Sequence, residues 1–367
     1  MVRILQVVAD GKPGGGTTVV LTLSSLLAER GHEVHFVSQQ GSYALEEARR
    51  LGLHAHGIDF SSRWKTPVVA AHLSSLMRRI SPRVVHAHGA RAGLPVSLAC
   101  SLTRQGPTRR LYTVHGFHYQ GKKSIVRWLA RLAETACMRS ADATIFVSAG
   151  DRELAQRDGL LRWTQQHSTI HNAVLIDPEL MQTQTKTYDV GFLGRLTRQK
   201  NPLFLTRIFQ ALQPDCPRIA VIGGGELQQR LQQDLADAGL LDRVSLLGEC
   251  SRTRALELLA QCRVLVLPSL WEGHPIALIE AAQLAIPAVA SDIQGSNEVI
   301  DSAVTGFLVS PHEPQAYAQR LRQLLDDDEL RATMGRTARA LAQQRYSPQA
   351  MLACHLREYG LAAAGTA

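Results

Sequence analysis

Two glutamates that stand eight residues apart, Glu272 and Glu280, are the residues of this sequence best suited to chemistry. They lie in SLWEGHPIALIEAAQLAIPAVASD, where Glu280 is the single charged residue of a largely apolar helical run. A carboxylate that faces an apolar interior is costly unless hydrogen bonds satisfy it. Glu280 therefore either reaches water beside Gln283 or accepts hydrogen bonds from a ligand.

The residues between the two glutamates favour the ligand. Pro275 suits the first position of a helix, and the N–H groups of residues 276–278 would then lack partners inside that helix and attract a diphosphate. Glu280 lies about 7.5 Å further along the helix axis, roughly the distance from the diphosphate of a nucleotide to its ribose hydroxyls. A carboxylate accepts well from two such hydroxyls. We therefore predict that Glu280 binds ribose and that Glu272 faces a sugar at the other end of the diphosphate.

Two glycine-rich segments follow predicted strands. Gly223, Gly224 and Gly225 come after RIAVI, where they would let the backbone approach a nucleotide or turn tightly onto the next helix. Gln228 stands where a dinucleotide fingerprint needs its third glycine, which argues against a dehydrogenase. The segment PGGGTT, residues 13–18, joins the first strand to the first helix and would admit a phosphate or an acceptor.

Histidines end two further predicted strands. His88 lies in VVHAHG, and His115 lies in YTVHGFHY, three residues before His118. Ligand sites form beyond the carboxyl ends of parallel strands, so His115 is predicted to project toward a substrate. The alternative for a single histidine is a buried side chain with its hydrogen bonds satisfied, and for His88 the two interpretations are equally supported.

The elements that position these residues alternate along the chain. Apolar runs typical of buried strands occupy residues 2–9, 33–38, 83–89, 109–116, 143–150, 188–194, 218–225, 243–249, 263–269 and 287–292. Amphipathic stretches separate them, a pattern that indicates βαβ units, and the pattern is interrupted near 177–186. We expect an α/β protein with two doubly wound domains, at 1–178 and 187–347, and a helix at about 348–367 that packs back on the first. A ligand cleft between the two domains is expected.

Length and composition agree with two domains, because 367 residues exceed the size of one growing core. The 45% hydrophobic content includes no window of about 18 consecutive apolar residues, and MVRILQVVAD is typical of a first strand, not of a signal peptide. Six cysteines without a CxxC pair favour reduced thiols. A cytoplasmic location is therefore predicted.

The net charge of +8 is concentrated in the first half of the chain. Residues 1–188 hold 23 Lys and Arg against 13 Asp and Glu, whereas the remainder holds 17 against 19. The basic first half of the chain is therefore expected to bind an anionic partner. Only 5% of the residues are aromatic and no nucleic-acid module is recognisable, so a membrane surface or a phosphorylated acceptor is favoured over nucleic acid.

The stretch GKKSIVRWLARLAETACMR, residues 121–139, combines basic side chains, including Lys122 and Lys123, with apolar ones. It could lie on an anionic membrane surface. The alternative is a core-packed helix with one solvated face.

Taken together, these motifs resemble a known family. The E-x7-E pair, GFLGRLTRQKNP, VIGGGELQQRL, GSNEVI, TVHGFHY and PGGGTTVVLTLSSLLAERGHEV are similar to motifs of retaining glycosyltransferase family 4, in that family's order and over nearly the whole chain. The resemblance implies the GT-B fold, with two Rossmann-like parallel-sheet domains that face each other across a cleft. It also implies a nucleotide-sugar donor bound mainly by the C-terminal domain, as in bacterial enzymes that make exopolysaccharide, O antigen or lipopolysaccharide.

The resemblance implies a role for each matching residue. The catalytic set would be His115, beside the reacting sugar, with Glu272, Arg195 and Lys200. The two cations would stabilise the leaving diphosphate, although a solvated basic loop is the alternative. The donor site would comprise Gly15, Gly16, Gly194, Arg195, Lys200, Gly223, Gly225, Glu272, Gly273, His274, Ile276, Ala277, Leu278 and Glu280. The acceptor site would comprise Gly14, Thr17, His88 and His118, although Gly16 and Thr17 stand where the family commonly has Ala-Glu.

The expectation is a retaining, metal-independent hexosyltransferase that uses a UDP- or GDP-linked sugar. Its acceptor would be a saccharide or polyprenyl-linked molecule at the inner face of the cytoplasmic membrane. No cofactor and no metal are expected, because Asp326 and Asp328 match D-x-D only between two helical stretches, where capping explains them. The alternatives are a nucleotide-sugar epimerase of the same fold, which would need no acceptor, and a non-catalytic nucleotide-sugar binding subunit.

Overall fold

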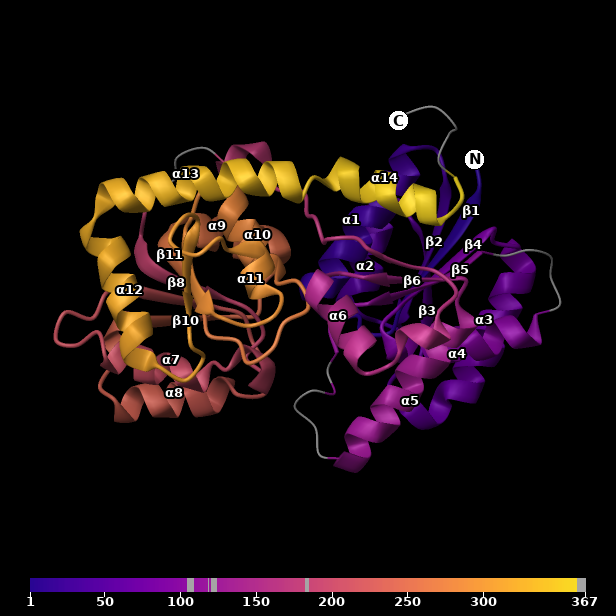
Figure 1. Cartoon of the computed structure of the whole chain (residues 1–367), viewed down its shortest axis with the longest axis horizontal. Helices are drawn as coiled ribbons and strands as arrows, with labels where there is room; N and C mark the ends of the chain where they lie inside the picture. Colours follow the sequence, from indigo (N-terminus) through magenta and orange to yellow (C-terminus); the bar gives the residue numbers. More distant parts are fainter. Residues whose placement is uncertain (104–108, 118, 120–123, 182–184, 362–367) are drawn as a thin grey trace. The chain divides into compact units, whose positions relative to one another are not determined.

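The computed structural model describes residues 1–103, 109–117, 119, 124–181 and 185–361 and divides the chain into two compact units (Figure 1). The first comprises Met1–Ala173 and Pro348–Ala367, and the second comprises Val174–Ser347. The second unit therefore begins a few residues before the interruption expected at 177–186.

The first unit is built on a seven-stranded parallel sheet in the order β3-β2-β1-β4-β5-β6-β7. Its strands are β1 (Arg3–Val8), β2 (Glu33–Gln39), β3 (His54–Ile58), β4 (Val84–His88), β5 (Arg109–Val114), β6 (Ala143–Phe146) and β7 (His167–Thr169). The chain proceeds from β1 outward to β3 and then crosses to β4 on the other side. The switch point, where doubly wound sheets bind ligands, thus lies between the carboxyl ends of β1 and β4.

Helices connect these strands. They are α1 (Gly15–Glu29), α2 (Tyr43–Arg50), α3 (Thr66–Ile80), α4 (Ala90–Leu102), α5 (Ser124–Ser140), α6 (Ala149–Arg157) and α14 (Pro348–Glu358), with 3-10 turns η1 (Arg63–Lys65) and η2 (Leu161–Trp163). Helix α14, from the end of the chain, packs beside α1 (Figure 1). The C-terminal helix therefore belongs to the first unit.

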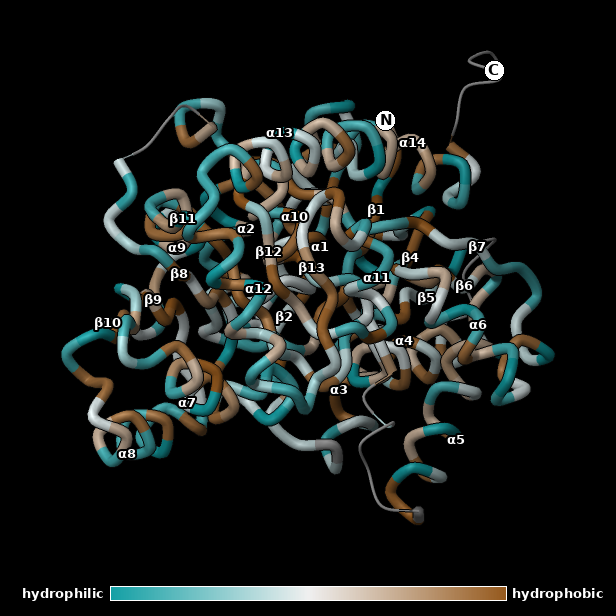
Figure 2. The backbone as a smooth tube through the Cα atoms, turned by 60° about the vertical axis from the view of Figure 1, so that its left-hand side comes forward, coloured by the Kyte–Doolittle hydropathy of each residue, from teal (hydrophilic) through white to brown (hydrophobic). Residues whose placement is uncertain are grey.

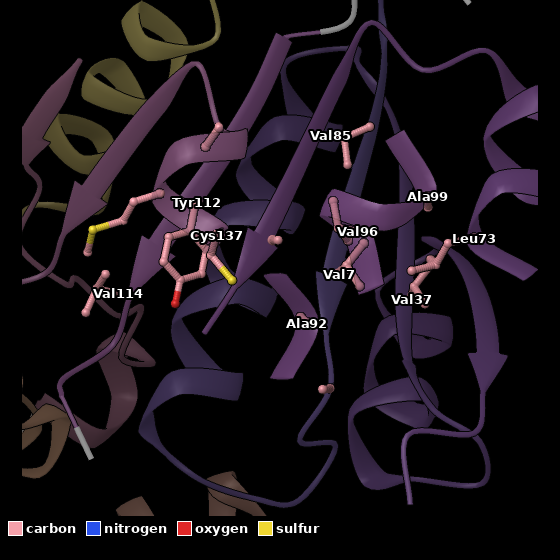
Figure 3. Packing of buried hydrophobic residues seen from close by; sticks show 14 of the residues in the cluster. Val7, Val37, Leu73, Val85, Ala92, Val96, Ala99, Tyr112, Val114 and Cys137 are labelled. Carbon is pink, nitrogen blue, oxygen red and sulfur yellow. The ribbon is translucent and has the colours of Figure 1, made fainter. Parts of the chain in front are cut away.

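The two faces of this sheet differ in polarity. Leu5, Val7 and Val85 on the central strands pack with α3 and α4 in one apolar cluster (Figure 3). Successive residues of a strand point to opposite faces, so Gln6 and His86 lie on the other face, where both are fully buried. Buried polar groups require hydrogen-bond partners, and these residues bond to one another, as described below.

The second unit contains a six-stranded parallel sheet in the order β10-β9-β8-β11-β12-β13. Its strands are β8 (Tyr188–Leu193), β9 (Ile219–Ile222), β10 (Val244–Gly248), β11 (Cys262–Leu267), β12 (Ala288–Ser291) and β13 (Gly306–Val309). Its helices are α7 (Leu203–Gln210), α8 (Gln228–Asp237), α9 (Arg252–Ala260), α10 (Ile276–Gln283), α11 (Ser296–Val299), α12 (Pro314–Asp326) and α13 (Asp328–Arg345), with turns η3 (Pro178–Met181), η4 (Arg198–Lys200) and η5 (Leu241–Arg243). Here the switch point lies between β8 and β11.

The strands expected from the apolar runs are all present, and β3, β7 and β13 are additional. The D-x-D segment lies at the junction of two helices, as expected: α12 ends at Asp326, and Asp327 caps α13 by accepting from Leu330 N at 2.8 Å. None of the six cysteines forms a disulfide. None of the helices in the described ranges combines the length and hydropathy that a membrane crossing needs.

Candidate functional site

Two loops meet at the switch point of the second unit, one after β8 and one after β11, and they hold Glu272. Leu270 N donates to Gln199 O at 2.8 Å, which joins the loops through their backbones. Glu272 Oε1 accepts from Lys200 Nζ at 2.5 Å and from Ser269 Oγ at 2.6 Å. Because the side chains of Lys200 and Glu272 are only 16% and 6% exposed, this is a largely desolvated ion pair.

The pair gives Lys200 a role that the sequence did not indicate. Its ammonium already neutralises Glu272, so a bound diphosphate would share this cation with the carboxylate. Arg195, on the same loop, is exposed. The structure therefore places Lys200 in a buried polar cluster with Glu272 and Ser269.

Glu280 is buried, with 6% of its surface exposed, in a helix whose residues are all buried. The interpretation in which Glu280 reaches water is therefore wrong. Arg252 Nε donates to Glu280 Oε1 at 3.3 Å, and Arg252 Nη2 donates to Leu175 O at 2.8 Å. Burial raises the pKa of Glu280, and the charges of Arg252 and Lys200 oppose that rise. Arg252 thus donates a hydrogen bond of the kind that we expected a ligand to donate to Glu280.

Arg252 belongs to none of the motifs described above. The available signal was its position, since it is the first residue of α9, which starts just beyond the carboxyl end of β10. Ser251 caps this helix by accepting from Arg254 N at 3.3 Å, and so fixes the start of the helix at Arg252.

The start of α10 differs from the prediction by one residue. Pro275 is the N-cap, with extended backbone, and Ile276 is the first helical residue. Leu278 N donates to Pro275 O at 3.1 Å. Of the N–H groups predicted to bind a diphosphate, those of Ile276 and Ala277 are the ones that helix geometry leaves without an intrahelical acceptor.

The residues between Glu272 and Pro275 are closely packed. The buried ring of His274 packs edge-on against Tyr346, with centroids 5.0 Å apart. A Cβ on Gly295, whose φ is +86°, would lie 2.3 Å from Gly273 O. The loop before α11 therefore needs glycine in order to support the loop that carries Glu272.

Close backbone contacts also explain the glycines after β9. A Cβ on Gly223 would lie 2.1 Å from Gly194 O, and one on Gly225 would lie 2.5 Å from Leu196 O. Both glycines have positive φ, +130° and +156°. A side chain at either position would push apart the loops after β8 and β9, so these glycines shape the edge that carries Lys200.

In the first unit, the loop after β1 leads from Gly14 into α1, whose first residue is Gly15. Thr17 is buried and its hydroxyl donates to Lys12 O at 2.9 Å, so this side chain holds the loop. A Cβ on Gly16 would meet nothing within 4 Å, so packing does not require glycine there.

His88 and His115 are in direct contact. His88 Nδ1 lies 3.0 Å from His115 Nε2, and His88 Nε2 lies 2.8 Å from Gln6 Oε1. Burial lowers the pKa of His88 well below its ordinary value, so the ring is neutral. The structure thus joins a predicted acceptor residue to the predicted catalytic histidine, through contacts that the sequence did not reveal. His118 lies outside the described residues.

The D-x-D segment has structural partners. Asp328 Oδ1 accepts from Arg263 at 2.7 Å and also pairs with Arg331, while Asp327 caps α13. Within the part of the chain that the structure describes, no group of three or more His, Cys, Asp and Glu is arranged to hold a metal ion.

Comparisons with known proteins cover both units. The model for Glycosyltransferase Family 4 matches residues 13–177, and that for Glycosyl transferases group 1 matches residues 179–341. The UDP-Gal:alpha-D-GlcNAc-diphosphoundecaprenol alpha-1,3-galactosyltransferase of Escherichia coli is 28% identical over 274 residues, 70% of this chain and 69% of that protein. The capsular polysaccharide biosynthesis glycosyltransferase CapM of Staphylococcus aureus is 23% identical over 345 residues, 88% of each chain.

Among solved structures, Anabaena Alr3699/HepE in complex with UDP and glucose superposes with a TM-score of 0.81 and 19% identity, over 98% of this chain and 100% of that one. This likeness, with the two all-parallel sheets, confirms the expected GT-B fold class.

Proposed function

The chain belongs to glycosyltransferase family 4, and we propose that it is a retaining, metal-independent enzyme that transfers a hexose from a UDP-linked sugar to a lipid-linked saccharide. Glycosyl transfer itself follows from family membership. The donor, the stereochemistry, the acceptor and a role in bacterial polysaccharide synthesis are the proposal. The names of the E. coli and S. aureus relatives and the UDP in the Anabaena complex support it.

The observation that carries the proposal is the pair of buried glutamates at the switch point of the second unit, each beside a cation. Glu272 is held by Lys200 and Ser269, and Glu280 by Arg252. Buried charges that only stabilised the fold could be replaced by apolar residues at little cost. Two such pairs, with the N-terminus of α10 between the glutamates, fit a ligand that carries a diphosphate between two hydroxyl-rich sugars.

The reaction requires positive charge at the leaving group. As the bond from the anomeric carbon to the diphosphate oxygen breaks, negative charge grows on that oxygen, and Lys200, Arg195 and the N–H groups of Ile276 and Ala277 would stabilise it. The acceptor oxygen bonds to the same face of the anomeric carbon, and its proton passes to the departing phosphate. These groups supply the positive charge for which other transferases use a metal ion.

Helix α5 supports a lipid-linked acceptor. Ile125, Trp128, Leu129 and Leu132 follow helical spacing and are 72%, 58%, 55% and 46% exposed, which makes one unpartnered apolar face. Apolar and hydrophilic stretches alternate along α5 in Figure 2. The other side of the helix joins the core, where Ala130 packs against the cluster that contains Cys137 and Met138. We therefore place α5 on an anionic membrane surface, at the inner face of the cytoplasmic membrane. Lys122 and Lys123 lie outside the described residues.

The proposal is tested by nucleotide binding and turnover. UDP at about 100 times its dissociation constant should stabilise the protein by about 2.7 kcal/mol and raise Tm by several degrees, whereas ADP should not. Glu280→Gln should fold normally and lose that shift. Glu257→Gln, which alters an exposed carboxylate paired with Arg254, is the matched control and should keep it.

With a UDP-sugar and a polyprenyl diphosphate saccharide, the NMR spectrum of the product should show the anomeric configuration of the donor. Conversion of the donor sugar without any acceptor would indicate an epimerase, and UDP binding without turnover of any sugar would indicate a binding subunit. The absence of a shift with UDP and with GDP would contradict the proposed donor site.

A further inference from the structure

A series of hydrogen-bonded side chains, called here the hydrogen-bonded chain, leads from His115 to the C-terminal segment of the protein. His115 Nε2 lies 3.0 Å from His88 Nδ1, and His88 Nε2 lies 2.8 Å from Gln6 Oε1. Gln6 Nε2 then donates to Tyr359 Oη at 2.9 Å. Tyr359 is the residue after α14. The hydrogen-bonded chain therefore links His115, at the carboxyl end of β5, to a residue 244 positions later in the sequence.

The chain continues beyond Tyr359 on the same face of the sheet. Tyr359 Oη lies 2.8 Å from His86 Nδ1, and His86 Nε2 lies 2.7 Å from Thr113 Oγ1. Gln6 and His86 have no exposed surface, and Thr113 and Tyr359 are each 2% exposed. Water therefore does not compete for these bonds, and each group depends on its neighbour in the chain.

With the Gln6 amide oriented as in the structure, Nε2 toward Tyr359 and Oε1 toward His88, the donors and acceptors run in one direction along this hydrogen-bonded chain. A neutral imidazole has one donor and one acceptor nitrogen, and burial lowers the pKa of both His86 and His88 well below the ordinary value, so both rings are neutral. Since Gln6 Oε1 can only accept, His88 Nε2 carries the proton. His88 Nδ1 must then accept, and His115 donates to it from Nε2.

The other half of the chain follows the same logic. Tyr359 Oη accepts from Gln6, so its own proton is directed to His86 Nδ1, and His86 Nε2–H donates to Thr113 Oγ1. Rotating the Gln6 amide by half a turn would reverse every donor at once. The bonds are thus coupled, and loss of one link weakens the constraint on the others.

We infer that Tyr359 and Gln6 are positioning residues for His115, which hold its ring in one orientation with the proton on Nε2 and the lone pair on Nδ1. The C-terminal segment thereby acts on this histidine through Gln6 and His88. The expected effect on turnover rests on the proposed function, in which His115 lies beside the reacting sugar. The orientation and the tautomer of the His115 ring do not depend on that function.

The test uses the full-length protein labelled with ¹⁵N-histidine, with the His115 signals assigned by comparison with His115→Gln. Long-range ¹H–¹⁵N spectra should show a single Nε2–H tautomer in the wild type and a mixture in Tyr359→Phe. Tyr112→Phe is the matched control, because the Tyr112 hydroxyl is equally buried in the same unit but donates to Glu134 Oε2, at 2.6 Å. It should leave His115 unchanged.

Turnover gives the second measurement. Loss of one hydrogen bond in the chain should lower kcat about five- to tenfold in Tyr359→Phe, with the donor KM within about twofold. If Tyr359→Phe does not fold, Gln6→Met breaks the chain one residue nearer to His115 and should give the same mixture.

A single unchanged tautomer in both variants would overturn the inference, and so would a fall in kcat without a change of tautomer. A tautomer mixture with unchanged kcat would confirm the link to the C-terminal segment and would contradict the catalytic role of His115. Failure of the inference and failure of the proposed function thus give different results.

Discussion

Glu272 is held inside the second unit by Lys200 and Ser269, which donate to the same carboxylate oxygen. Such a desolvated pair adds little stability over an apolar pair, but breaking it leaves an unpaired buried charge. The same holds for Glu280, whose carboxylate is satisfied in part by Arg252. At the scale of residues, then, each carboxylate predicted to bind the donor is held in place before any donor arrives.

This arrangement predicts the effect of Lys200→Met. The unpaired carboxylate of Glu272 should destabilise the second unit by about 3 kcal/mol, and the double variant Lys200→Met/Glu272→Gln should recover most of that loss. Urea unfolding measures the change, with amide exchange in β8 and β11 assigning the transition to this unit.

Arg230→Met is the control for Lys200→Met, since Arg230 and Asp234 form an exposed i,i+4 pair on α8. It should change stability by no more than about 0.5 kcal/mol. Equal losses in Lys200→Met and Arg230→Met would contradict the buried pair.

At the scale of elements, the exposed fraction of the side chains distinguishes helices that have the same amphipathic pattern in the sequence. An amphipathic pattern shows that a helix has an apolar face but not what covers it. The first half of α5 presents its apolar residues outward, whereas Cys137 and Met138 at its end are buried. The apolar pattern also fails to predict two strands, because β3 and β7 are short, polar edge strands without an apolar run.

The exposed face of α5 leads to a prediction for membrane binding. The wild type should sediment with vesicles that contain phosphatidylglycerol, and Trp128→Glu should reduce the bound fraction severalfold, because burying a charge in the interface is unfavourable. Leu241→Glu introduces the same charge at an exposed leucine of the second unit and should bind as the wild type does. Equal binding by all three proteins would contradict the placement of α5.

At the scale of the whole molecule, the two units should respond to acid in opposite directions. In the first unit, burial lowers the pKa of His86 and His88 well below the ordinary value and lowers that of His355 to about 4. Between the unfolded value of 6.5 and these folded values, the unfolded state binds more protons, so stability falls as pH falls. Glu134, whose pKa burial raises to about 7, has the opposite effect, but burial also lowers the pKa of His32, of His35 and, to about 4, of His56, so Glu134 is one group against six histidines.

The prediction is a fall in the free energy of unfolding of the first unit from about pH 6.5 to about pH 4, to which His355 alone contributes about 3 kcal/mol. In the second unit the pKa of the buried Glu280 is raised, so protonation stabilises that unit as pH falls. Calorimetry at several pH values should show the melting transition of the first unit shifting down relative to the other. His355→Gln should reduce that shift, and parallel shifts of both transitions would contradict the prediction.

The sequence by itself determined the two doubly wound sheets, the family, the positions of Glu272, Lys200 and His115 in segments that follow strands, and that of Glu280 in the helix after Pro275. It could do so because apolar periodicity and strand-end motifs are local properties of the chain. Only the tertiary structure decided which groups satisfy these side chains. Arg252 contacts Glu280, Lys200 contacts Glu272, and Gln6 and Tyr359 contact the histidines. Each of these contacts joins segments that are far apart in sequence. No local pattern encodes such contacts, because each depends on how separate elements pack.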